Sequence, residues 1–184
     1  ADYHADIRIS NDILKLLSEV YRKIRNTARY ILGNVSDFEP GRDMVPFDQL
    51  TDLDKWALAR FNELVKSAKA AYDKFEFHIV YHALHNFCTI DMSNFYLDVI
   101  KDRLYVEAAD SQNRRAAQTT IYTILRGLDL ILAPIIPFTA EEIWQFMPAD
   151  EKYCADSVML NDMPAAQDGL VDEGFMQKWD RIHA

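Results

Sequence analysis

The strongest constraint on the fold of this chain is an amphipathic stretch between residues 11 and 34. Plotted at 100° per residue, six apolar side chains stay within about 60° of one line, which is typical of a helix that packs on a core. They are Ile13, Leu17, Val20, Ile24, Ala28 and Ile31. Ser10 can cap the start, and Gly33 with Asn34 can end the helix. The pattern predicts a helix of about 22 residues, roughly 33 Å long.

The opposite side of this predicted helix is basic. Residues 22–29 carry four cationic side chains, although the formal net charge of the chain is −9. The polar residues opposite the apolar line are Lys15, Arg22, Arg25, Asn26 and Arg29. The alternative, an ordinary solvated face, usually mixes both signs, whereas only Glu19 opposes five cations between Leu14 and Leu32. A local positive cluster on an acidic protein indicates a partner with concentrated negative charge, such as the phosphates that arginine binds.

The rest of the periodicity predicts an all-α, antiparallel helical bundle. Helices are predicted over residues 51–73, 76–105, 112–132 and 139–147, with an irregular crossing segment over residues 34–50. Thr51 can cap the first of these helices, and Thr139 with Glu142 has the spacing of a capping box. Only five Gly and six Pro occur, which favours helices over strands and tight turns.

Two units are expected along the chain. The first is a bundle over residues 1–148, and the second is a small irregular appendage over residues 149–184. Within the appendage, Ser157–Leu160 is expected to be extended. A last helical pattern begins near Val171 and carries on one side Phe175, Trp179 and Ile182. It reaches the end of the chain without a stop signal, which predicts a truncated helix.

The composition narrows the class of protein. The longest apolar run, residues 128–138, contains Asp129 and two prolines, far from the roughly 20 apolar residues that span a bilayer, so a soluble protein without a membrane partner is expected. The start lacks signal-peptide features and does not begin with Met, so we expect a processed end or a boundary within a longer protein. Cys88 and Cys154 fit neither a disulfide framework nor a zinc ribbon, which favours a reducing, cytoplasmic location.

Negative charge is concentrated in the C-terminal third. Residues 127–184 hold three basic and eleven acidic side chains, whereas residues 1–126 hold seventeen and eighteen. The C-terminal third therefore suits a nucleic acid poorly, and anion binding is expected in the N-terminal two thirds.

Catalytic and metal sites are not indicated. His78, His82 and His85 fall within about 60° of one another on a helix, a spacing that permits metal ligation. No carboxylate completes the set and the neighbours are aromatic, so packing histidines without a metal are the favoured interpretation. No glycine-rich phosphate loop, nucleophile elbow or His-Glu-x-x-His motif occurs. An intrahelical salt-bridge set is expected from Asp98, Lys101, Asp102 and Arg103.

Three runs of the sequence carry a family resemblance. They are Tyr21–Arg29, His85–Tyr105 and Ala133–Trp144. Together they resemble the helical anticodon-binding domain of bacterial isoleucyl-tRNA synthetases. Prolines followed by a Thr-x-Glu-x-x-Trp pattern also occur in the valyl, leucyl and methionyl relatives, whereas Arg25–Thr27 and Asp91–Asp98 favour the isoleucyl member.

The resemblance implies a parent enzyme that uses ATP with magnesium to attach isoleucine to its tRNA. The His-Ile-Gly-His-like and Lys-Met-Ser-Lys-Ser-like motifs of such a catalytic domain do not occur here, nor does the family's zinc-binding region. This chain is therefore expected to be a fragment that does not aminoacylate and needs no cofactor, and that holds the anticodon stem–loop. Its expected partners are an isoleucine-specific tRNA and the parent's catalytic domain, and a monomer is expected. The alternatives are a helical protein-interaction module or the equivalent domain of a valyl, leucyl or methionyl relative.

The resemblance also implies which residues meet the tRNA. In the methionyl relative, the C-terminal half of the first helix contributes an Asn and an Arg four residues apart to anticodon recognition. Arg25 and Arg29 occupy the matching positions here, so the first departs from that pattern. Asn26 is then the candidate for base-edge hydrogen bonds, and Arg22, Arg25 and Arg29 are candidates for the RNA backbone. Further candidates are Lys101 and Arg103 as cations and Tyr30 as a stacking surface.

Overall fold

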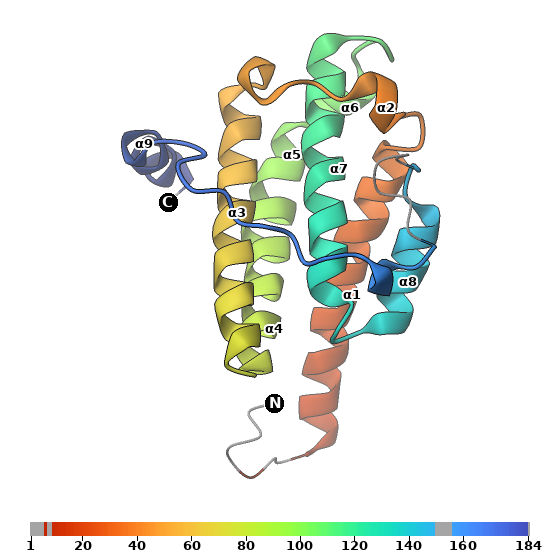
Figure 1. Cartoon of the computed structure of the whole chain (residues 1–184), viewed down its shortest axis with the longest axis vertical. Coiled ribbons are helices and arrows are strands. Elements are labelled where there is room, and N and C mark those ends of the chain that lie inside the picture. Colours follow the sequence, from red (N-terminus) through yellow and green to blue (C-terminus); the bar gives the residue numbers. More distant parts are fainter. Residues whose placement is uncertain (1–5, 7–8, 150–155, 184) are drawn as a thin grey trace.

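The computed structural model describes residues 6, 9–149 and 156–183, and it contains no strand within these ranges. Long helices form an antiparallel bundle, in which α1 and α4 to α6 run in one direction and α3 and α7 in the other (Figure 1). The helices are α1 (Asn11–Asn34), α2 (Pro40–Asp43), α3 (Asp52–Asp73), α4 (Phe77–Asn86), α5 (Leu97–Val99), α6 (Lys101–Tyr105), α7 (Gln112–Leu132), α8 (Pro137–Phe146) and α9 (Glu173–His183), with the short or irregular turns η1 (Phe47–Gln49), η2 (Phe87–Tyr96) and η4 (Val158–Leu160). The predicted all-α bundle is confirmed.

Capping side chains determine where the long helices begin. Ser10 Oγ accepts a hydrogen bond from the amide of Ile13 at 3.2 Å. Thr51 and Asp54 form a reciprocal capping box at the start of α3. The predicted starts of α1 and α3 are therefore confirmed, as are the bounds of α3 and α7.

Helix α1 ends at Asn34, so the predicted stop at Gly33 with Asn34 is confirmed, and the amide of the capping residue Val35 donates to Ile31 at 3.0 Å. One predicted helix differs in detail. The segment predicted as one helix over residues 76–105 is divided, since η2 is π-helical and a further break follows at Ile100. In this wider register, Asp91 reaches Arg60 of α3, so interhelical pairing accompanies the departure from α-helical geometry.

Three predictions for the C-terminal part of the chain differ from the structure. Helix α8 begins at Pro137, which has no amide hydrogen to lose at a helix start, so the predicted capping box at Thr139 is wrong. The Thr139 hydroxyl instead lies 3.0 Å from that of Tyr21. Residues 158–160 form the 3-10 turn η4 rather than an extended segment, because the buried Val158 is held by Glu141. In α9, Phe175 and Trp179 pack on the core whereas Ile182 is exposed.

Helices α1, α3 and α7 enclose the core together with η2. Helices α3 and α7 approach closely where the ring of Phe61 lies over Gly127, since a Cβ at that glycine would sit 2.3 Å from the ring. Residues 161–172 run across α7 and α3 as an extended strap (Figure 1). The Asn62 amide secures it by donating to the carbonyl of Gln167 at 2.7 Å and accepting from its amide at 2.8 Å.

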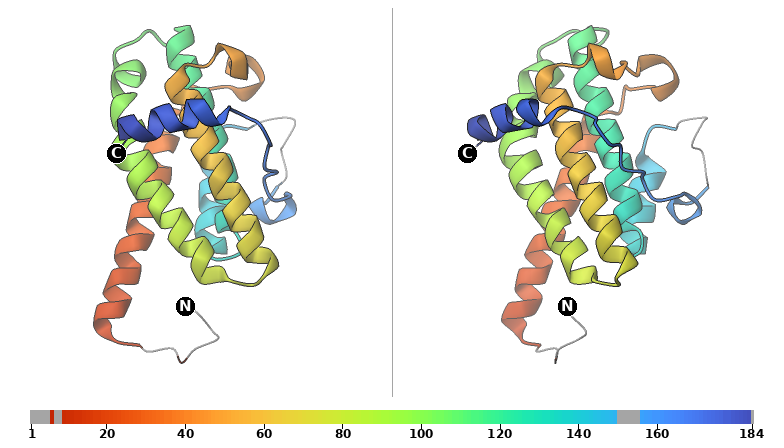
Figure 2. Two further views of the ribbon diagram at one scale, coloured as in Figure 1. Left: turned by 90° about the vertical axis from the view of Figure 1, so that its left-hand side faces the viewer. Right: turned by 60° about the vertical axis from the view of Figure 1, so that its left-hand side comes forward.

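The first half of α1 projects beyond the bundle (Figure 2). Ile13 and Leu17 were predicted to face the core, but both are exposed because no other described element reaches this part of the helix. The buried side of α1 is confined to its second half, from Ile24 to Ile31. No helix in the described part of the chain is both long and apolar enough to cross a membrane.

Candidate nucleic-acid interface

The second half of α1 presents the predicted cations to solvent. Arg22, Arg25, Asn26 and Arg29 are all exposed. On the opposite side of the helix, Thr27 Oγ1 lies 3.2 Å from Ser93 Oγ of η2. The core contacts of Ile24 and Ile31 on this side hold α1 in one rotation about its axis, which keeps the cations outward.

Most cations in this half of α1 form no ion pair with the residues that the structure describes. Arg25 Nη2 lies 3.8 Å from Glu142 of α8, a long and exposed ion pair that contributes little to stability. Arg22, Lys23 and Arg29 form no ion pair with any residue that the structure describes. Three positive side chains on one helix are therefore available to an external anion.

A groove runs between the second half of α1 and α8, and we call it the α1–α8 groove. Its volume is about 860 Å³. Arg25 and Arg29 lie along its α1 side. The apolar residues that line it are Leu32, Phe38, Pro40, Ile143, Phe146, Met147, Pro148 and Ala149. Two carboxylates also line it: Glu39, which pairs with Arg42 at 2.9 Å, and Glu142, which lies 3.8 Å from Arg25. A basic edge beside an apolar surface can bind a ligand that is both aromatic and anionic.

A second, shallower groove lies on the other side of Arg29, and we call it the α1–α6 groove. Its volume is about 440 Å³, and it is lined by Asn26, Arg29, Tyr30, Gly33, Asn34 and Tyr105. Asn34 Nδ2 donates to the carbonyl of Tyr30 at 2.8 Å and to the hydroxyl of Tyr105 at 3.4 Å. Burial, and then the adjacent Tyr105 hydroxyl, raise the pKa of Tyr30. Arg29 and Gly33 border both grooves, so Arg29 is the central cation of the surface.

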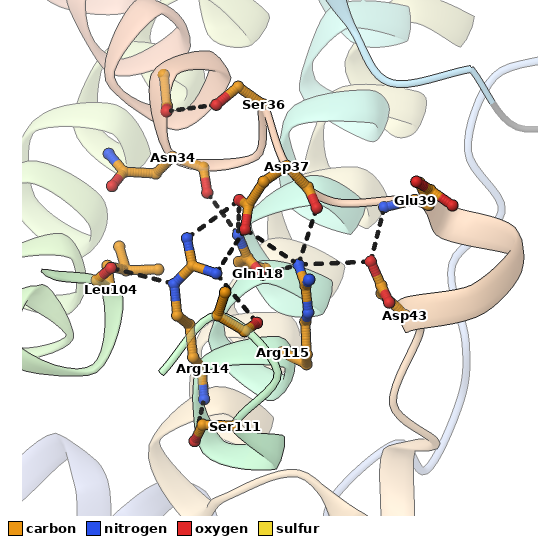
Figure 3. Close-up of polar contacts among 12 residues, drawn as sticks. Asn34, Ser36, Asp37, Glu39, Asp43, Leu104, Ser111, Arg114, Arg115 and Gln118 are labelled. Atoms are coloured by element: carbon orange, nitrogen blue, oxygen red, sulfur yellow. Dashed lines mark hydrogen bonds and ion pairs between the residues drawn. The ribbon is translucent and has the colours of Figure 1, made fainter. Parts of the chain in front are cut away.

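An ion-pair cluster surrounds Asp37 (Figure 3), whose chain neighbours Ser36 and Phe38 line the α1–α8 groove. Arg114 of α7 donates to both carboxylate oxygens of Asp37, at 2.6 and 3.0 Å, and the hydrogen bond from Arg114 lowers the pKa of Asp37. Arg115 donates to the Asp37 carbonyl at 3.0 Å, and Gln118 donates to the carbonyl of Asn34 at 2.9 Å. The cluster therefore ties the end of α1 and the following crossing segment to α7.

The sequence interpretation missed this cluster, although a signal was present. Two adjacent arginines, Arg114 and Arg115, occupy the first turn of α7, where the helix dipole disfavours positive charge. Cations at such a position indicate a specific acidic partner, which here is Asp37.

Arg103, which was predicted as a tRNA contact, is not part of the exposed surface. Its side chain is only 12% exposed, because it donates to the fully buried carboxylate of Asp54 at 2.7 and 2.9 Å and to the carbonyl of Asn113. Tyr96 also donates to Asp54, at 2.6 Å. A guanidinium engaged by a buried carboxylate cannot leave it for a phosphate without a large desolvation cost.

Lys101 and Tyr30, the other two further candidates for a tRNA contact, each make contacts within the protein. Lys101 is exposed and pairs with Asp98 at 2.5 Å, which confirms one pair of the predicted salt-bridge set, whereas Arg103 of that set pairs with Asp54 instead. Tyr30 is half-buried and packs on the core, so little of its ring is free for stacking. The aromatic residues that the prediction missed are Tyr105 and Phe146, which are 63% and 72% exposed and line the two grooves.

The three histidines are not gathered into a metal site. In the ranges that the structure describes, no group of three His, Cys, Asp or Glu side chains is placed to hold a metal ion. Cys88 is a buried free thiol, and burial raises its pKa to about 12. Cys154 lies outside the described residues.

The chain is similar to known tRNA ligases along its whole length. It is 52% identical to isoleucine–tRNA ligase from Syntrophotalea carbinolica over 98% of the chain and 19% of that protein. It is 50% identical to the isoleucine–tRNA ligases of Caldanaerobacter subterraneus subsp. tengcongensis and Desulforamulus reducens, over 99% and 100% of the chain and 20% of each relative. The chain therefore spans about a fifth of the length of the curated relatives it matches.

A family model supports the same assignment. Residues 54–183 match the model described as the anticodon-binding domain of tRNA ligase. Helix α1 precedes the matched residues, but it lies within the alignments to the relatives. This chain belongs to the family of anticodon-binding domains of tRNA ligases.

Proposed function

We propose that this chain binds the anticodon stem–loop of a tRNA along the exposed cations of α1. The observation that carries the proposal is that Arg22, Lys23 and Arg29 lie exposed on α1, without an ion pair to any described residue, in a domain of this family. Phosphate contacts supply most of the affinity in such complexes, and side chains that reach base edges add specificity. Arg22 and Arg29 would bind phosphates, and the exposed amide of Asn26 would face the bases.

The names of the relatives support a more specific proposal about the tRNA and about the longer protein. Because they are isoleucine–tRNA ligases, the tRNA would be specific for isoleucine, and the domain would position it for aminoacylation elsewhere in a longer protein. ATP, magnesium and zinc would act in other parts of that protein, and this chain itself would act as a binding domain without a cofactor. We propose a monomer in the cytoplasm.

The projecting half of α1 is assigned to a protein contact rather than to RNA. Its exposed apolar side chains include Leu14, Leu16 and Leu17. A contiguous apolar surface indicates a protein partner, and the catalytic domain of the parent enzyme is the proposed one. Substitution of these leucines should therefore leave the RNA affinity unchanged.

The proposal is tested by titrating the chain with the anticodon stem–loop of an isoleucine tRNA at several salt concentrations. If the four cations of residues 22–29 each displace a counterion, log affinity should fall with log salt with a slope of about −3. Arg25→Ala with Arg29→Ala should weaken binding and reduce the slope to about −1.5. Since both side chains are exposed, the melting temperature should change by no more than about two degrees.

Two control variants distinguish RNA binding at the proposed interface from a general effect of the protein's net charge. Lys69→Ala with Lys74→Ala removes the same charge from exposed positions at the far end of α3 and should change the slope little. Leu14→Ser with Leu17→Ser changes the projecting half of α1 and should preserve the affinity. A flat salt response, or equal losses from both cation pairs, would refute the proposed interface.

A further inference from the structure

The α1–α8 groove combines a positively charged edge with an apolar lining, and no single protein side chain complements both. Its α1 edge carries Arg25 and Arg29, which are one helical turn apart, and its apolar lining includes Phe38, Ile143 and Phe146. The volume of about 860 Å³ falls within the range of pockets that hold small ligands. The groove is thus large enough to take a compact group with an apolar body and a negative charge.

Phe146 is the exposed aromatic side chain of the groove lining. It lies at the end of α8 with 72% of its surface exposed, beside the basic edge of the groove. A phenyl ring in this position offers a flat apolar face to a ligand, and aromatic faces of this kind bind unstacked nucleobases in RNA complexes.

The two arginines at the edge are not equivalent. Arg25 is held near Glu142 at 3.8 Å, which offsets part of its charge. Arg29 has no ion pair within the described ranges and reaches the α1–α6 groove as well. Charge complementarity therefore places an anionic group next to Arg29 rather than next to Arg25.

A nucleotide complements both parts of this arrangement within one unit. A single apolar side chain would cover Phe146 but leave Arg29 unpaired, and a single acidic side chain would pair with Arg29 but leave Phe146 exposed, so a peptide would need two side chains to do the same. A nucleotide supplies an aromatic base and a phosphate in one unit, so it satisfies both parts of the groove.

We infer that the α1–α8 groove receives one unstacked base of the bound RNA, with Phe146 as its stacking surface and Arg29 as the contact to the adjacent phosphate. This inference rests on the proposed RNA binding and adds to it a defined base pocket. The crossing segment that forms one wall is held by the Asp37 cluster, so the pocket is preformed before the RNA arrives.

The test compares two exposed phenylalanines of the same helix. Phe146→Ala removes the stacking surface, whereas Phe138→Ala removes a ring that is 93% exposed and does not line the groove. Binding of the isoleucine anticodon stem–loop is measured by fluorescence anisotropy. Loss of one stacked base corresponds to at least about a fivefold loss of affinity for Phe146→Ala, and Phe138→Ala should stay within about twofold of wild type. Phe146→Tyr should restore the affinity, since the aromatic face is retained.

A second readout separates stacking from charge. Phe146→Ala should leave the salt slope unchanged, whereas Arg29→Ala should reduce it by about 0.7 and weaken binding more than Arg25→Ala does. With 2-aminopurine placed at each loop position in turn, one position should show fluorescence quenching that depends on Phe146 and not on Phe138. Equal affinities and equal quenching for Phe146→Ala and Phe138→Ala, with binding still sensitive to Arg29, would refute the base pocket alone. Absence of any RNA binding by the wild-type chain would instead refute the proposed function.

Discussion

Replacement of Asp129 by Asn should make this protein more stable, and increasingly so as the pH rises. Asp129 lies near the end of α7, is fully buried, and neither carboxylate oxygen has a hydrogen-bond partner among the residues that the structure describes. Burial, and to a smaller extent the charge of Glu141, raise the pKa of Asp129 to about 8. Asn preserves the shape of the side chain but cannot ionise.

The sign and size of the effect follow from proton linkage. In the unfolded chain this carboxyl ionises near 3.8, whereas the folded protein keeps the proton up to about pH 8. The unfolded state therefore releases its proton first, so the free energy of unfolding falls as the pH rises from about 4 to about 8 and levels off above that range. One pKa unit corresponds to about 1.4 kcal/mol, so roughly 2.5 kcal/mol of this loss occurs between pH 6 and pH 8.5.

Urea denaturation at these two pH values measures the prediction. The range avoids the isoelectric point near 5.0, where the protein would have little net charge and would tend to precipitate. The stability advantage of Asp129→Asn over wild type should grow by roughly 2.5 kcal/mol from pH 6 to pH 8.5. Asp73→Asn changes an exposed carboxyl at the end of α3 and should alter stability by less than about 0.5 kcal/mol at either pH. An advantage of Asp129→Asn that does not vary with pH would refute the reasoning.

Two further substitutions test the packing around the interface. Arg103→Ala should lower the free energy of unfolding by about 3–5 kcal/mol, because it leaves the buried carboxylate of Asp54 without its cation. Lys101→Ala is its matched control on the same helix, and a loss no larger than that of the control would contradict the buried ion pair. Gly33→Ala should raise stability by up to about 1 kcal/mol, since alanine favours a helix and its Cβ would meet no atom within 4 Å. Thermal unfolding checks this change, and a lower melting temperature would show that the glycine is required by the backbone.

The features that the sequence predicted well are those that depend on neighbours within a few residues. Ser10 and Thr51 start their helices because a side-chain oxygen meets an amide three residues later, which is a local geometry. The outward direction of Arg25, Asn26 and Arg29 follows from the 3.6-residue period together with the buried side of the same turn. The family could also be identified from short runs of residues.

Two of the errors concern contacts between distant parts of the chain, and one concerns a proline that begins a helix earlier than predicted. Arg103 looked like one of several exposed cations near Asp98, but it pairs with Asp54, which is 49 residues away in the sequence. Thr139 had the spacing of a capping residue, but Pro137 begins α8 earlier. Ile13 continued the apolar line of α1, yet the bundle does not extend far enough to cover it.

The sequence by itself determined the all-α class, most helix bounds, the family, and the side of α1 that carries the cations. Only the tertiary structure decided which cations remain available, since Arg103 and Arg114 are neutralised by Asp54 and Asp37 whereas Arg29 is not. It also formed the α1–α8 groove, which combines Arg29 with Phe146 from a helix more than a hundred residues later. The physical reason is that periodicity and capping act within one helix, whereas burial and ion pairing depend on which helices meet.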